Sequence, residues 1–226
     1  RLDVGYLIPV MFYKVYDNIV NNSHIQEGSN AQIFFNVSSR NQLKNTHLYT
    51  SVFIDEIRMS TVFVRAKSRN QLGYTLGGSV TDIGVPYLTF NAEYTRINPF
   101  VYNNIIPAQT YTSHGYYMGD WMGNNADRFI AFIKYTPLPK LKTSVTYQKV
   151  RKGSEGTLDQ QYFAEPQPQF LFDLQRDQTA FIFNTSYEWI NNLYLAARVS
   201  AFTDNNFINK TQTKNTQFQF SISYGL

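Results

Sequence analysis

The residues of this chain that could do chemistry gather in one segment, NPFVYNNIIPAQTYTSHGYYMGDWMGNNAD, which spans residues 98–127. Its length of about thirty residues is unusual for a connection between two regular elements. Sugars stack their C–H faces on aromatic rings while amides and carboxylates bind their hydroxyls, and ligand sites generally combine apolar surfaces with a few fixed polar groups. The segment therefore predicts a sugar-binding loop. A long loop that folds over a barrel mouth and packs on itself would have the same composition.

Four aromatic rings of this segment could stack on sugars, and four of its amides and carboxylates could bind hydroxyls. The candidate polysaccharide-binding residues in the loop are Tyr111, Tyr116, Tyr117, Asp120, Trp121, Asn124, Asn125 and Asp127. Arg151 and Lys152 precede another long loop and could pair with acidic sugars through charge-assisted hydrogen bonds.

Catalytic patterns are missing from the sequence. There is no cysteine, and His24, His47 and His114 share no metal-ligand spacing. The carboxylates of Asp55 and Glu56 are adjacent on an expected strand, so they point to opposite faces and do not form an acid/base couple. We expect no enzymatic activity, no metal and no cofactor. The net charge of +4 is too small to predict a nucleic-acid partner.

Apolar and polar residues alternate with a period of two along most of the chain, as in Leu88, Phe90, Ala92 and Tyr94. This pattern predicts about ten strands of about ten residues each, a length that crosses a bilayer when the strand is tilted. The expected strands are 3–13, 31–40, 46–57, 70–81, 87–97, 127–137, 141–151, 178–190, 193–203 and 214–226.

Short and long connections alternate between these strands. The longest are residues 98–126 and 152–177, the gap 204–213 is of medium length, and every short turn falls on the side where the chain ends. Outer-membrane barrels have tight periplasmic turns and long extracellular loops. The sequence therefore predicts one all-β domain over residues 1–226, a transmembrane antiparallel up-and-down β-barrel in a bacterial outer membrane. Its long loops would be extracellular and its C-terminus periplasmic.

In such a barrel the apolar face of each strand contacts lipid and the polar face lines the lumen. The charged residues assigned to the lumen are Glu93, Arg96, Arg128, Lys134, Lys142 and Arg198, with Glu188 as a further counter-charge. These charges could form a salt-bridged plug or could line a channel. Rings near strand ends on the turn side would lie at the membrane interface, namely Tyr135, Tyr147, Trp189 and Tyr224.

Four stretches, in this order, are similar to a known family: LYTSVFIDEIR (48–58), LTFNAEYTRINPFVY (88–102), HGYYMGDWMGNNADRF (114–129) and YTPLPKLKTSVTYQKVRKG (135–153). Together they resemble the Wzi-type capsule-assembly family of outer-membrane β-barrel proteins, in its Bacteroidetes-like form. The resemblance implies a barrel of about eighteen strands, of which this chain would be the C-terminal part. It also implies binding of capsule or exopolysaccharide and a role in its assembly or attachment, without an enzymatic step.

Two other functions remain open at this stage. One is a porin-like channel for small anionic solutes, in which Arg96, Arg128 and Arg198 would favour anions. The other is a structural subunit of an outer-membrane complex. The expected partners are outer-membrane lipid, polysaccharide and other envelope proteins, with no nucleic acid.

Overall fold

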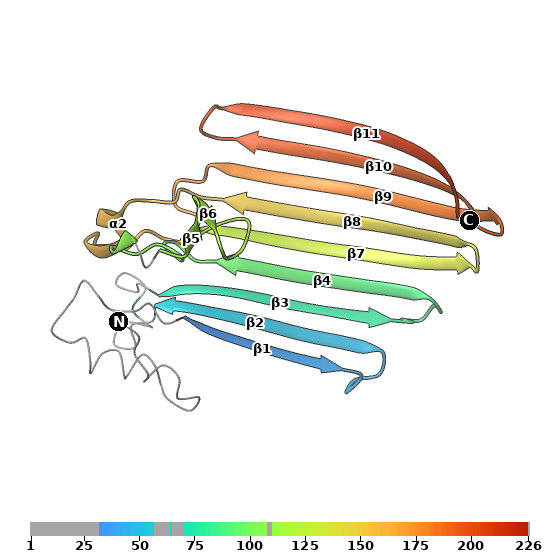
Figure 1. Ribbon diagram of the computed structural model, residues 1–226, viewed down its shortest axis with the longest axis horizontal. Helices are drawn as coiled ribbons and strands as arrows, with labels where there is room; N and C mark the ends of the chain where they lie inside the picture. Colours follow the sequence, from blue (N-terminus) through green and yellow to red (C-terminus); the bar gives the residue numbers. More distant parts are fainter. Residues whose placement is uncertain (1–31, 57–63, 65–69, 108–109, 226) are drawn as a thin grey trace.

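The structure, a computed structural model, describes residues 32–56, 64, 70–107 and 110–225. Its main feature is an antiparallel nine-stranded sheet in which the strands lie side by side in chain order (Figure 1). The strands are β1 (Ile33–Arg40), β2 (Thr46–Glu56), β3 (Gln71–Thr81), β4 (Leu88–Ile97), β7 (Ala126–Leu138), β8 (Leu141–Lys152), β9 (Arg176–Ile190), β10 (Leu193–Asn206) and β11 (Thr211–Tyr224). The expected all-β class and the up-and-down antiparallel order are therefore confirmed.

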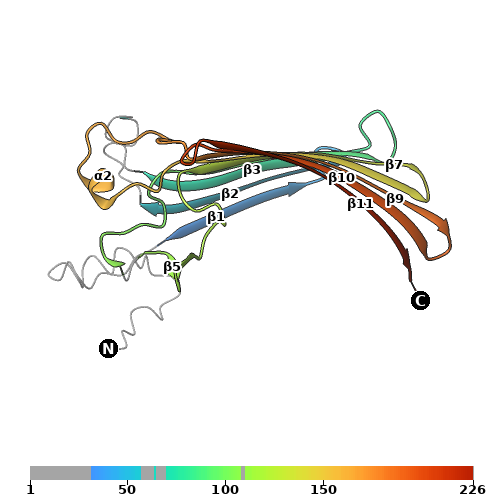
Figure 2. The same cartoon turned by 90° about the horizontal axis from the view of Figure 1, so that it is seen from above.

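Each strand of this sheet falls on one of the ranges that alternation predicts, while the expected strand 3–13 lies outside the described residues. The sheet curves along its length, and β1 and β11 are its two edges (Figure 2). Within the described residues it is thus an open sheet and not a closed barrel.

The connections separate the two ends of the sheet as expected. The long connections 98–125 and 153–175 leave it at one end, together with the short elements β5 (Thr112–Ser113), β6 (Tyr116–Tyr117) and α2 (Leu158–Tyr162) (Figure 1). We call this the loop end. The tight turns after β1, β3, β7 and β9 lie at the opposite end with the C-terminus, which we call the turn end.

The expected medium gap at 204–213 is wrong, because β10 and β11 continue into it and leave only residues 207–210 as a turn. Polar contacts between β9 and β10 and between β10 and β11 hold this extension. The guanidinium of Arg176 on β9 donates to the carboxylate of Asp204 at 2.6 Å, and Gln212 Nε2 donates to Asn205 Oδ1 at 2.7 Å. Strand formation depends strongly on such cross-strand partners, which a run of polar residues does not reveal.

The two faces of the sheet differ in chemistry. Residues paired across an antiparallel ladder point to the same face, and the row Phe90–Ile133–Val145–Phe183–Val199–Phe218 runs unbroken across β4 and β7–β11. We call the face that carries this row the apolar face. Its large side chains are exposed in the described structure, including Phe183 at 42% and Phe218 at 77%.

The opposite face, which we call the polar face, carries the row Lys134–Ser144–Asn184–Arg198–Gln219 across the same strands from β7 onward. His47 also lies on it, as alternation predicts, since it pairs with Ser79 and its ring lies 2.9 Å from the Ser38 hydroxyl. Tyr147 departs from the expected position near a strand end, because it pairs with Ala131 and Phe181 in the middle of β8.

Four of the five cations assigned to the lumen lie on the polar face, and Arg96 does not. Arg96 pairs with Tyr74 and Asp127, on the face of Tyr94 and Phe90. Its charge suggested an inward position, but the two-residue period of the strand places it with the apolar set. The expected counter-charge Glu188 also has a different partner, because its Oε1 accepts a hydrogen bond from the backbone N–H of Asn192 at 3.2 Å.

A chain of polar contacts crosses the polar face from β2 to β7. Tyr49 donates its hydroxyl proton to Glu93 Oε2 at 2.6 Å, and Arg128 Nη2 donates to Glu93 Oε1 at 2.6 Å. The Tyr49 ring passes over Gly77 of β3, where an added Cβ would overlap it. Gly77 is therefore needed for this close approach, and Glu93 is a counter-charge to Arg128.

We predict that Gly77→Ala lowers the free energy of unfolding by about 1 to 3 kcal/mol, because the new methyl group displaces Tyr49 from Glu93. Urea unfolding in detergent micelles measures the change. In a Tyr49→Ala background the same substitution should cost little, since Ala itself is tolerated better than Gly in a strand. An equal loss in both backgrounds would show that the clash is not the cause.

Candidate functional site

The connection 98–125 folds onto the loop end of the polar face and forms the buried apolar core of the described residues. This core consists of Phe53, Ile97, Val101, Tyr102, Met122, Ala126 and Val150, and Tyr111 and Tyr117 pack against it. The ring of Tyr102 lies 5.9 Å from that of Tyr111 and 5.5 Å from that of Tyr117. Burial, together with the carboxylate of Glu155, raises the pKa of Tyr117 to about 12. Two of the four predicted stacking rings thus belong to the loop's own packing.

Asn125 joins the two long connections and is fully buried. Its Oδ1 accepts a hydrogen bond from the Leu171 N–H at 2.7 Å, and its Nδ2 donates to the carbonyls of Ser154 at 2.7 Å and Phe172 at 3.2 Å. The amide is therefore occupied by backbone groups of residues 153–175. Its predicted role as a binder of sugar hydroxyls is wrong.

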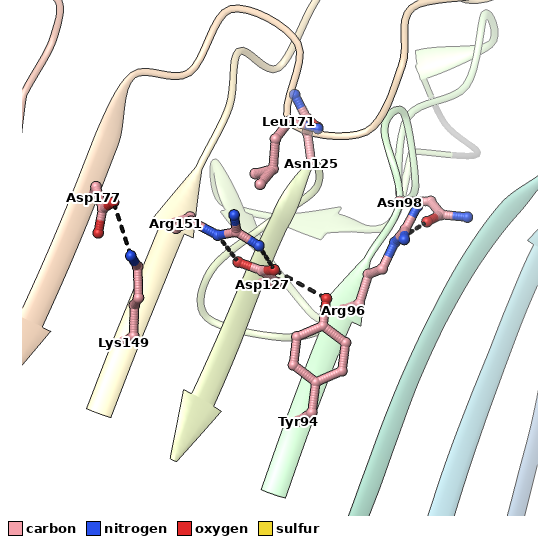
Figure 3. A network of polar contacts seen from close by, with 9 residues as sticks. All are labelled: Tyr94, Arg96, Asn98, Asn125, Asp127, Lys149, Arg151, Leu171 and Asp177. Carbon is pink, nitrogen blue, oxygen red and sulfur yellow. Dashed lines mark hydrogen bonds and ion pairs between the residues drawn. The ribbon is translucent and has the colours of Figure 1, made fainter. Parts of the chain in front are cut away.

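The carboxylate of Asp127, at the loop end of the apolar face, is also occupied by hydrogen bonds. Arg151 donates to both of its carboxylate oxygens, from Nε at 3.0 Å and from Nη2 at 2.5 Å, and the Tyr94 hydroxyl donates to it at 3.0 Å (Figure 3). Asp127 is only 3% exposed. Asp127 and Arg151 satisfy each other in a bidentate pair, so neither has the free role that was predicted.

This pair is part of a row of alternating charge. Arg96, Asp127, Arg151 and Asp177 are paired in register across β4, β7, β8 and β9. Lys149 Nζ reaches Asp177 at 3.3 Å from the neighbouring position on the same face (Figure 3). The apolar face is therefore bounded at the loop end by a row of charges, and Arg96 belongs to this boundary.

Lys152 and Asn124 form an internal contact. The Lys152 ammonium donates to the Asn124 carbonyl at 2.5 Å and lies 3.7 Å from Glu155, while Asn124 is fully buried. Asn124 is thus enclosed, with its Nδ2 lacking a hydrogen-bond partner in the described structure, and the Lys152 ammonium holds this part of the loop against β8.

The remaining predicted residues lie at the surface. Tyr116 is 79% exposed and Trp121 is 64% exposed, on a loop that its own core holds in place. The Asp120 side chain is half-buried and its Oδ1 accepts the Met122 N–H at 2.9 Å, which fixes the turn that presents Trp121. Of the predicted set, Tyr116 and Trp121 remain presented for stacking.

A cleft that sequence reasoning missed lies beside this loop. It is lined by amide side chains, namely Asn70, Gln71, Asn98, Gln161, Gln167 and Gln169. Phe100 and Phe170 add apolar walls, and the guanidinium of Arg96 lies 3.7 Å above the Phe170 ring while its Nε donates to Asn98 Oδ1 at 3.0 Å. The cleft thus combines aromatic and amide groups drawn from three distant parts of the chain.

Gln161 is the most informative residue of this cleft. It lies on α2, which begins with a capping box in which the Thr157 hydroxyl accepts from the Gln160 N–H and the Gln160 side chain accepts from the Thr157 N–H. Gln161 is 2% exposed and donates to the Asn103 carbonyl at 3.1 Å. Its Oε1 has no donor in the described structure. A buried acceptor without a partner costs free energy, so a ligand donor at this position would relieve that cost.

Among the described residues, the His, Asp and Glu side chains make no group of three or more that could hold a metal ion. In the same residues, no helix combines the length and the apolar character that spanning a membrane requires.

No family model matches the chain, and no curated protein matches it. The resemblance to the capsule-assembly family therefore remains a prediction.

We predict that Asn125→Ala lowers the free energy of unfolding by about 3 kcal/mol or more, because it leaves the Leu171 N–H and two carbonyls without partners in a buried site. Hydrogen exchange should show faster exchange at residues 170–173 than in the unaltered protein. Asn191→Ala is the control, since Asn191 is exposed at the turn end. Unchanged exchange at residues 170–173 would contradict the role of Asn125.

Proposed function

We propose that this chain forms part of an outer-membrane β-barrel that binds surface polysaccharide at its loop end and helps the assembly or attachment of capsule or exopolysaccharide. The observation that carries this proposal is the amide-lined cleft, in which the buried Gln161 Oε1 lacks a donor. The Wzi-type resemblance of the sequence agrees with the same function.

The chemistry of the cleft suits a carbohydrate. Sugars present many hydroxyls that can donate hydrogen bonds, and Gln161 Oε1 is a buried acceptor without a donor. The amide nitrogens of Asn98, Gln161 and Gln167 already donate to backbone carbonyls, which holds these side chains in place, and an amide oxygen has two lone pairs for hydroxyl donors. The ring of Phe170 gives an apolar surface for C–H groups. Outside the cleft, the exposed rings of Trp121 and Tyr116 in the connection 98–125 offer further stacking surfaces.

The membrane part of the proposal is supported by the apolar face and by the two unequal ends. Exposed apolar side chains such as Leu76, Phe183 and Phe218 cover the apolar face between the turn end and the row of charges at the loop end. Lipid would accept this surface better than water would. Backbone groups cannot remain unpaired in hydrocarbon, so β1 and β11 would need further strands or each other as partners. The loop end would be extracellular and the turn end periplasmic. Lipid and other envelope proteins would be the remaining partners.

A polysaccharide-binding role fits better than an open channel for small anions. The core of the connection 98–125 covers the loop end of the polar face, which would narrow a lumen at that end. The single-channel conductance of the reconstituted protein separates the two functions, because the proposed barrel would conduct little.

We predict that Phe170→Ala, and separately Gln161→Met, weaken retention of isolated surface polysaccharide by about tenfold or more, because each removes a main contact of the cleft. Affinity electrophoresis in detergent measures the retention. Phe163→Ala is the matched control, since Phe163 lies in the same connection but is 73% exposed and outside the cleft. Equal retention by all three variants would remove the cleft from the proposal.

We predict that Phe183→Arg lowers the stability of the protein in lipid by about 2 to 4 kcal/mol, because it places a charge on the apolar face near the middle of β9. Asn184→Arg, one residue further on and on the polar face, should have a much smaller effect. Unfolding from lipid vesicles measures both. A similar loss for the two variants would contradict the lipid-facing assignment.

A further inference from the structure

We propose that the turn half of the polar face holds a second binding surface, for an acidic oligosaccharide. It is formed by the cations Lys134, Lys142 and Arg198 together with the neutral side chains of Ser144, Asn184 and Gln219. The surface lies apart from the amide-lined cleft and shares no residue with it.

The sheet register brings these side chains together. Lys134, Ser144, Asn184, Arg198 and Gln219 occupy one row across five neighbouring strands, and all five line the same hollow. Lys142 lines it from the next row toward the turn end, where it pairs with Ser186. The three cations therefore point to one side of the sheet and into one concavity.

The cations of this hollow lack counter-charges in the part of the chain that the structure describes. Elsewhere on the same face, Arg128 is paired with Glu93 and Arg176 with Asp204, both at 2.6 Å. Lys134, Lys142 and Arg198 form no such ion pair among the described residues. Glu188, at the turn end of β9, instead accepts the backbone N–H of Asn192. A concave surface with cations and no paired acid attracts anions.

The spacing of the charges favours an extended ligand. Lys134 and Arg198 are three strand intervals apart, which corresponds to about 14 Å at the usual spacing between strands. Between them Asn184 Nδ2 donates to the Ser144 hydroxyl at 3.3 Å, so amide and hydroxyl groups fill the space. Cations separated by neutral hydrogen-bonding groups match a sugar chain that carries both carboxylates and hydroxyls, and Arg198 can bind a carboxylate with two parallel hydrogen bonds.

The test measures binding of a short oligogalacturonate to the purified full chain in detergent micelles by calorimetry at low ionic strength. The double variant Lys134→Gln/Arg198→Gln should bind it about tenfold or more weakly, because two charge-assisted contacts are lost. Lys149→Gln is the matched control, since Lys149 lies on the same strand as Lys142 but on the opposite face. It should bind as the unaltered protein does.

Three results would overturn this inference: no binding by the unaltered protein, an equal loss in Lys149→Gln, or equal binding of a neutral oligogalactoside. Equal affinity for tripolyphosphate would overturn the assignment to a sugar. The variant Phe170→Ala keeps the two proposals distinguishable. If it lost oligogalacturonate binding as strongly as the double variant, the ligand would sit in the amide-lined cleft and the second surface would be wrong.

Discussion

The backbone hydrogen-bond ladder between neighbouring strands is the constraint on which the rest of this structure depends. Because side chains alternate between faces, a shift of one residue in any pairing would exchange the faces of that strand. The ladder instead keeps Ile133, Val145 and Phe183 in one row and Lys134, Ser144 and Asn184 in the next. In each of the consecutive pairs 133–134, 144–145 and 183–184, one side chain lies on the apolar face and the other on the polar face. The two faces of the sheet therefore need different surroundings.

The buried core follows from the same constraint. Hydroxyl, amide and charged groups are frequent on the polar face, and its buried apolar side chains, such as Phe53, Ile97 and Val150, lie at the loop end. The connection 98–125 packs there and removes this apolar area from water. The aromatic content of the loop therefore serves first to hold it on the sheet, and the rings that remain exposed are presented on a fixed support.

The sequence was sufficient to predict the strands and the unequal ends, because alternation and connection length are local properties of the chain. It was not sufficient for the site. Asn125 and Asp127 were assigned to sugar hydroxyls from their residue types, yet the same amide and carboxylate groups equally satisfy backbone N–H groups and an arginine. Arg96 was assigned to the lumen by its charge. Because it lies two residues after Tyr94 on the same strand, alternation already placed it on the apolar face. The amide-lined cleft brings together Gln71, Asn98 and Gln161, which are far apart in the chain. No local sequence pattern predicts such a cleft.

The two proposed binding surfaces differ in how their polar groups are held, and this bears on what each would recognise. In the cleft, Gln161 is fixed by the capped turn of α2 and by its bond to Asn103, so its unpaired acceptor is already in place before a ligand arrives. Such preorganisation favours selectivity, because little side-chain freedom is lost on binding. In the hollow, Lys134 and Lys142 are exposed. Because a lysine carries its charge on a flexible stem, they would attract charge over a distance but fix its position weakly. An acidic polysaccharide would therefore be selected at the loop end by its hydroxyls and held along the polar face by its charge.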